Sequence, residues 1–209
     1  MVKDMTKGNP MKIIIRFCLP LMMGNLFQQF YNMADTIIVG RFLGTAALAS
    51  VGGTASVITY QIIMIFTGLS SGATVIISQC FGAGDTERLH RGLHTAFAFA
   101  IVTSIFISII GWFAAPWILQ VTKTPAEILD SSTTYLRIYF IGVLATFLYN
   151  MGSSIMRAVG DSKRPLYFLI ICSILNIILD LVFIIVFKMG TAGAAFATIL
   201  SQAVSAILI

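Results

Sequence analysis

The sequence predicts an all-α protein that spans a membrane with six helices. Of its 209 residues, 58% are hydrophobic and only 10% are charged, and the mean hydropathy is +0.95. A soluble domain usually carries about 25% charged residues. In lipid only helices and closed barrels satisfy their own backbone polar groups. The apolar runs are long and unbroken rather than short and alternating, which favours helices over a barrel.

Charged residues separate the apolar runs, and each run is long enough for one span because a membrane helix needs roughly 20 apolar residues. The second run lacks a polar break and is short for two spans, so we expect one long, tilted or bent helix there. The expected helices are 13–39, 46–81, 93–121, 128–156, 166–187 and 191–209.

Proline and glycine mark the expected bends and turns. Pro20 lies inside the first helix, where it removes a backbone hydrogen bond and predicts a kink. This kink is either a hinge or a static bend. Residues 82–85 and 160–165 are rich in turn-forming residues and predict tight turns before the third and fifth helices. Gly68 and Gly72 form a pair of small residues that predicts close approach of a neighbouring helix.

The distribution of Lys and Arg predicts the orientation. With six helices and a cytoplasmic N-terminus, nine basic residues fall on the inner side and four on the outer side. Cytoplasmic loops are enriched in Lys and Arg, so we expect a multi-pass protein of the cell (plasma or inner) membrane with a cytoplasmic N-terminus. The inner residues are Lys3, Lys7, Lys12, Arg16, Arg88, Arg91, Arg157, Lys163 and Arg164, and the outer ones are Arg41, Lys123, Arg137 and Lys188.

Two acids lie inside the apolar runs, Asp35 in the first helix and Asp180 in the fifth. An aspartate at a helix centre costs roughly 2.5–3.5 kcal/mol on insertion scales, so such residues usually have a function. Counting along the two helices places both acids in the outer half of the membrane, where they can share a cavity. No Lys or Arg lies at their depth in either helix. Their expected counter-charge is therefore a proton, a metal cation or a cationic substrate.

Polar side chains recur on one face of four helices, because positions three and four apart share a face. Lipid cannot pair these groups, so we expect the stripes to face inward around a wet or ion-filled cavity. The alternative is hydrogen bonding between helices that only holds the bundle together. The stripes are Asn25, Gln28, Gln29, Asn32, Asp35 and Thr36; Tyr135, Tyr139, Thr146, Tyr149, Asn150 and Ser153; Asn176 and Asp180; and Thr198, Ser201, Gln202 and Ser205.

These features predict a cation-coupled transporter. Removing a carboxylate from water disfavours its charged form, so an unpaired buried carboxylate can take up a proton or small cation from one side. It can release that cation when water reaches it from the other side. Binding then shifts the balance between two conformations as far as the cation prefers one of them.

Several short segments together form a specific pattern. They are Leu19–Pro20, Gln28–Thr36, Ile77–Gln79 with Gly82–Asp85, Arg157–Pro165, Asn176–Asp180 and Gly193–Thr198. On these segments the chain resembles the N-terminal lobe of the multidrug and toxic compound extrusion (MATE) transporters, in particular their DinF-like branch.

The resemblance implies a six-helix lobe over residues 1–209, half of a twelve-helix transporter with pseudo-twofold symmetry, whose C-terminal lobe is absent from the chain. It implies export of cationic, drug-like molecules in exchange for protons or sodium ions. Both coupling ions stay open, and no cofactor is expected. The implied partners are the substrate, the lipid bilayer and the missing lobe, with no nucleic acid.

The resemblance also implies roles for individual residues. The N-lobe cation site, where sodium would be held, matches Asp35, Asn176, Asp180 and Thr198. Pro20 matches the bending proline of the first helix. The resemblance and the polar stripes together predict the residues that line the cavity: Gln29, Asn32, Tyr135, Tyr139 and Asn150.

Three alternatives were weighed. A lipid-linked precursor or polysaccharide flippase of the same superfamily would share the lobe, but such proteins line their cavity with basic residues, and here the acids have no basic companions. A serine hydrolase would need the residues around Ser70 at a strand-to-helix elbow with a base nearby. Ser70 instead lies in a membrane helix, far from His90 and His94, so no enzyme is expected. Nothing suggests the repeated filter of a channel.

Overall fold

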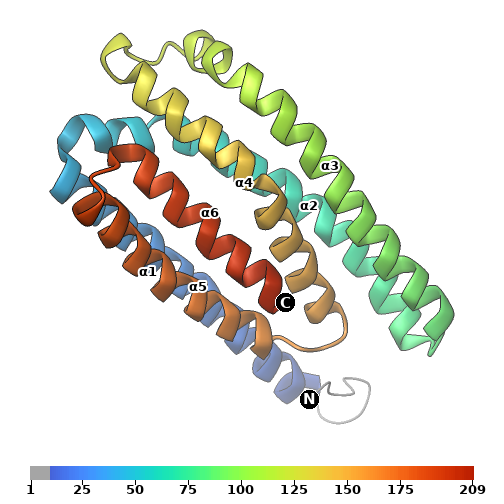
Figure 1. Cartoon of the computed structure of the whole chain (residues 1–209). Helices are drawn as coiled ribbons and strands as arrows, with labels where there is room; N and C mark the ends of the chain where they lie inside the picture. The colour runs from blue at the N-terminus through green and yellow to red at the C-terminus, as the bar shows by residue number, and fades with distance from the viewer. Residues whose placement is uncertain (1–9) are drawn as a thin grey trace.

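The computed structural model describes residues 10–209, which form six long helices (Figure 1). A single π-helical segment, η1 (Val182–Val186), continues the fifth helix. Six helices are long and apolar enough to cross a membrane, which confirms the predicted all-α membrane fold. Lys3 and Lys7, assigned above to the inner side, lie outside the described residues. The helices are α1 (Pro10–Gly52), α2 (Thr54–Gly82), α3 (Thr86–Val121), α4 (Ala126–Ala158), α5 (Lys163–Leu181) and α6 (Gly190–Leu208).

The connection between the first two spans differs from the expected boundaries. α1 runs on to Gly52, but its helical geometry is interrupted at Gly44, whose φ of 86° lies in the left-handed region. Glycine adopts this conformation readily because it has no Cβ atom. α2 begins only at Thr54. The expected second helix, 46–81, therefore starts too early, because residues 45–52 form a separate helical segment that follows the break at Gly44.

Side-chain caps explain why α3 and α5 begin earlier than the apolar runs. The Asp85 carboxylate accepts a hydrogen bond from the Arg88 backbone N–H over 3.0 Å, so α3 begins at Thr86 rather than at 93. Asp161 accepts from the backbone N–H groups of Lys163 and Arg164, each over 3.2 Å, and α5 begins at Lys163 rather than at 166. Such caps satisfy the free N–H groups of a first turn. The bounds of α4 and α6 differ from those expected by only one or two residues.

α4 is the central helix of the bundle. It packs against α2, α3 and α6, and also contacts α1 and α5. α6 lies between α4 and α5, α1 runs beside α5, and α3 forms the opposite edge (Figure 1). The outer helices expose large apolar side chains such as Phe113, which is 74% exposed. These faces suit contact with lipid tails.

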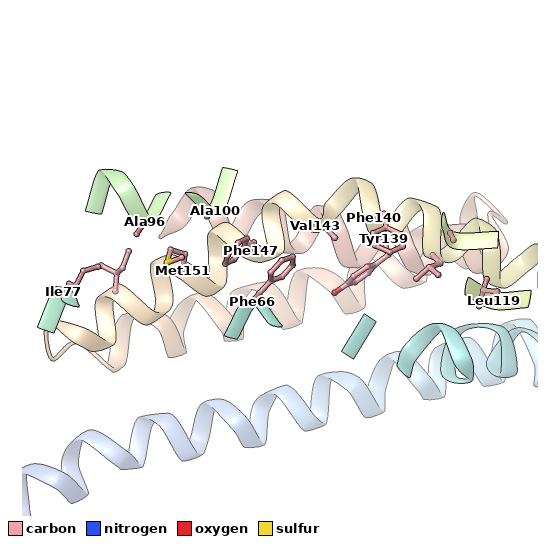
Figure 2. Packing of buried hydrophobic residues seen from close by; sticks show 13 residues of the cluster. Phe66, Ile77, Ala96, Ala100, Leu119, Tyr139, Phe140, Val143, Phe147 and Met151 are labelled. Atoms are coloured by element: carbon pink, nitrogen blue, oxygen red, sulfur yellow. The ribbon is translucent and has the colours of Figure 1, made fainter. Parts of the chain in front are cut away.

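The main core lies where α2, α3 and α4 meet (Figure 2). The rings of Phe66 on α2 and Phe147 on α4 stack with centroids 4.2 Å apart. On α4, Gly142 faces Ile199 of α6 so closely that a Cβ atom would overlap the isoleucine side chain. No atom of a neighbouring helix lies within 4 Å of the Cβ position at Gly68 or Gly72, so the predicted close approach at this pair is wrong.

Candidate functional site

A cavity of about 1370 Å³ has a wall formed by α1, α2, α4, the start of α5 and α6. Its wall includes two of the residues expected at the cation site, Asp35 and Thr198. The other two, Asn176 and Asp180, are fully buried behind the wall. All the residues expected to line a cavity, and the expected hinge, also contribute to the wall: Pro20, Gln29, Asn32, Tyr135, Tyr139 and Asn150.

The two acids come together because α1 runs beside α5. The carboxyl groups of Asp35 and Asp180 lie close enough to share a hydrogen bond when one of them carries a proton. Oδ1 of each carboxyl group is buried and has no hydrogen-bond partner within the described part of the chain. Buried polar atoms are normally paired, so the two unpaired oxygens set this pair of acids apart from most buried polar groups.

Asn176 links this pair to α6. It lies one turn before Asp180 on the same face of α5. In the side-chain orientation that satisfies both neighbours, its amide donates to Oδ2 of Asp180 over 3.0 Å, and its side-chain oxygen accepts from the backbone N–H of Thr198 over 3.2 Å. The Asn176 oxygen is therefore directed at α6, and the side chain presents an N–H group to the Asp180 carboxylate.

Thr198 and Tyr31 form the next layer. The Thr198 hydroxyl donates to the backbone carbonyl of Ala194 over 3.0 Å, and the Thr198 side chain also interacts with the Tyr31 hydroxyl. Tyr31 lies one turn before Asp35 on α1, and both line the cavity. Tyr31 was not predicted as a site residue. Its spacing of four residues from Asp35 is the signal that would have placed it on the same face.

The remaining predicted lining residues surround the pair or follow the cavity wall. Tyr135 is buried beside both acids, and Tyr139 lies one turn further along α4. On α1, the Asn32 amide donates to the Gln29 side-chain oxygen over 3.3 Å. The Asn150 amide donates to the Thr146 carbonyl over 2.8 Å, so part of this stripe is satisfied by its own helix.

The helix that carries Asp180 changes its winding directly after the acid. The α-helix ends at Leu181 and continues as η1, and Lys188 then adopts a positive φ of 53°. π-helical turns are rare and occur frequently at functional sites. Asp180 is therefore positioned immediately before a wider turn rather than in the middle of a regular helix.

The cavity also contains one basic residue that was not predicted there. Arg157, near the end of α4, contributes to the wall. The expectation that the acids have no basic companions is therefore wrong for the cavity as a whole. The expectation holds close to Asp35 and Asp180. Tyr135 lies beside these acids on α4, and Arg157 lies about six helical turns further along the same helix. The sequence predicts Arg157 only as a basic residue of an inner segment, because it does not reveal which way that face of the helix points.

Six apolar helices, five of which form the wall of a polar cavity beside buried carboxyl groups, define a multi-pass membrane protein of the transporter class. A family model described as MatE matches residues 20–182. The chain therefore belongs to the MatE family. Members of this family are transporters and not enzymes. This agrees with the prediction that Ser70 is not the nucleophile of a serine hydrolase.

Individual relatives agree with this assignment. The probable multidrug resistance protein YpnP of Bacillus subtilis is 36% identical over 202 residues, which cover 97% of this chain and 45% of that protein. The probable multidrug resistance protein NorM of Thermotoga maritima is 29% identical over 201 residues, 93% of this chain and 42% of that protein. The chain spans about half the length of the curated relatives it matches.

A solved structure shows the same arrangement of helices. It is described as the outward-facing conformation of a multidrug resistance MATE family transporter of the MOP superfamily. It superposes with a TM-score of 0.89 at 30% identity, and the match covers 98% of this chain and 46% of that chain.

Proposed function

We propose that this chain is the N-terminal six-helix lobe of a cation-coupled antiporter that exports organic, drug-like cations across the cell membrane. The observation that carries the proposal is the Asp35–Asp180 pair, which has no basic neighbour and opens through Asp35 onto a cavity of about 1370 Å³. Relatives named as multidrug resistance proteins support the substrate class.

Asp35 is the proposed point of exchange. It lies in the cavity wall, whereas Asp180 is fully buried and hydrogen-bonded to Asn176. A charged Asp35 attracts an organic cation, and a coupling ion bound at the pair removes that attraction. The two ligands then compete for one charge, and this competition links uptake of the coupling ion to release of the substrate.

The geometry favours a proton over sodium as the coupling ion. Sodium would need several oxygens directed at one point, but the Asn176 oxygen is engaged with α6 and its N–H group faces Asp180. The Thr198 hydroxyl hydrogen is likewise directed at Ala194. One proton placed between the two carboxyl groups provides a partner for their unpaired oxygens without moving either neighbour.

Pro20 is the proposed hinge. α1 remains helical through Pro20, which also lines the cavity, and Asp35 lies on the same helix. Because proline removes one backbone hydrogen bond, bending there costs less than elsewhere in the helix. Such a bend would move Asp35 relative to Asp180 on α5. Solved structures that this chain resembles at 30–31% identity are titled MATE in the bent and in the straight conformation.

The proposed setting is the cell membrane with a cytoplasmic N-terminus. The proposed partner is a second lobe that covers the polar face of α1 and α2. Side chains such as Asn25, Gln28 and Tyr60 line the cavity from these two helices. A second lobe placed there would convert the open cavity into a passage that can face either side of the membrane.

The test is accumulation of a fluorescent organic cation in cells that lack their own efflux pumps. Cells producing the complete transporter, with this chain joined to its second lobe, are expected to accumulate less dye than empty cells. Asp35→Asn in the same two-lobe protein is expected to restore the level of empty cells at equal expression. Asp130→Asn, which changes an exposed acid of α4, serves as the matched control and should leave export intact. Equal accumulation with wild type and Asp35→Asn would remove Asp35 from the mechanism.

The same cells distinguish the coupling ions. Collapse of the pH gradient with an ionophore should stop export, and replacement of sodium by potassium should leave it unchanged. The reverse result would assign the site to sodium. If the wild type exported no cation at all, the flippase alternative would replace the multidrug proposal.

A further inference from the structure

The cavity has a second polar end, at the last turns of α4. Arg157 is half-buried there and lines the wall with Tyr149 and Ser153 of the same helix. Among the described residues of the wall, Asp35 and Arg157 are the only charged ones. Tyr135 of α4 lies beside Asp35, and Arg157 follows Tyr135 by about six helical turns, or about 30 Å. Arg157 is therefore too far away to serve as the counter-charge of Asp35.

Arg157 also has no acidic partner elsewhere in residues 10–209. Its Nη2 atom donates one hydrogen bond, to the Ser154 hydroxyl over 2.8 Å. Asp161 is the nearest acid along the chain, but it is ion-paired with Arg164, with 3.3 Å between Oδ2 and Nε, and it caps α5. A guanidinium group has five N–H donors, so most of the hydrogen-bonding capacity of Arg157 is unused.

An unpaired cation in a half-buried position has an energetic cost, because it is partly removed from water without a counter-charge. A guanidinium group that forks around a carboxylate or a phosphate recovers this cost through two charge-assisted hydrogen bonds. The position of Arg157 in a cavity wall leaves space for such an anion.

The surroundings suit an anionic group attached to an apolar body. The Tyr149 hydroxyl lies beside the Ser153 side chain, and both provide further polar contacts next to Arg157. Leu166 and Leu169 of α5 add an apolar part to the wall of the same cavity. The Tyr149 ring adds an aromatic surface on which a planar molecule can stack.

We propose that the Arg157 end of the cavity is an anion subsite that binds the carboxylate or phosphate group of an amphipathic substrate. The inference rests on the proposed export function and extends it, since the substrates then include zwitterions as well as simple cations. The planar, always-charged guanidinium of Arg157 selects such groups, and Tyr149 and Ser153 complete the contact.

The test compares two xanthene dyes that differ in one group. One dye carries a free carboxylate, and the other is the methyl ester of the same dye. Fluorescence polarisation measures the binding of each dye to the purified protein in neutral detergent. The wild type should bind the acid more tightly than the ester. Arg157→Gln should weaken binding of the acid by about tenfold or more, the value of a charge-assisted hydrogen bond, and leave the ester unchanged.

Two further variants control for charge and for folding. Arg137→Gln changes another arginine of α4, one that donates to the Trp112 carbonyl over 3.3 Å and is not part of the cavity wall, and it should keep the preference for the acid. Arg157→Lys keeps the charge without the planar fork and should recover part of the preference. Unchanged ester binding shows that each variant is folded.

Equal binding of the two dyes by the wild type, or an unchanged preference in Arg157→Gln, would overturn the anion subsite. Displacement of the acid dye by phosphatidylglycerol at the level found in membranes would assign the site to a lipid headgroup and overturn the substrate assignment. The preference for the acid is measured as binding and not as export, so failure of this inference is distinguishable from failure of the proposed function.

Discussion

The carboxyl group of Asp35 on α1 lies beside that of Asp180 on α5, close enough for one proton to join them. The two acids have different surroundings. Asp180 is fully buried and fixed by Asn176, which donates to it over 3.0 Å, whereas Asp35 faces the cavity. One acid is therefore held in place, and the other is accessible from the cavity.

The first prediction concerns the fixed acid. Asp180→Asn should abolish cation export, because the pair then has one carboxyl group and cannot share a proton. The protein should stay folded, since the new side-chain oxygen can still accept the hydrogen bond from Asn176. Dye accumulation and the elution profile of the purified protein check the two parts separately. Export at the wild-type rate would show that Asp180 only packs the bundle.

The second prediction concerns Tyr31, which supports Asp35 from the preceding turn. Tyr31→Phe removes the hydroxyl that contacts Thr198, and Thr198→Val removes the other partner of the same contact. Each change should slow export, and the double variant should be no slower than the worse single variant. A coupling energy of about 0.5–3 kcal/mol in the double-mutant cycle is expected for groups in direct contact. Strictly additive effects would mean that the two side chains act independently.

The third prediction concerns the core. Phe147→Ala removes a ring that stacks on Phe66 and is fully buried. The free energy of unfolding should fall by about 3–5 kcal/mol, as for other buried aromatic truncations. Phe106→Ala on α3 is the matched control, because this ring is 65% exposed toward the lipid. Unfolding in mixed micelles with increasing dodecyl sulfate measures both variants, and an equal loss in the two would contradict the assigned core.

The fourth prediction concerns the contact of α4 with α6. Gly142→Ala places a Cβ atom into the Ile199 side chain and should destabilise the protein by about 1–3 kcal/mol, the usual cost of overpacking. Ile199→Ala in the same protein should recover part of this loss by making room. Gly72→Ala has open space at the Cβ position and should leave the thermal unfolding temperature unchanged or slightly higher. A destabilised Gly72→Ala would show that α2 is packed more tightly than described.

Much of this fold follows from local properties of the sequence. The number of spans follows from the length of the apolar runs, and the unusual acids at positions 35 and 180 stand out because charge inside lipid is costly. The turns at Asp85 and Asp161 follow from capping residues, although the apolar runs alone placed the helix starts several residues too late.

The sequence by itself determined the six membrane helices and the two acids buried among them, because hydrophobicity and charge are properties of single residues and short runs. Tertiary structure decided which faces meet. It placed α4 at the centre, brought Tyr31 to Thr198, set the direction of the Asn176 amide and exposed Arg157 to the cavity. These features depend on contacts between distant segments, and the rotation of each helix about its own axis is fixed only by its neighbours.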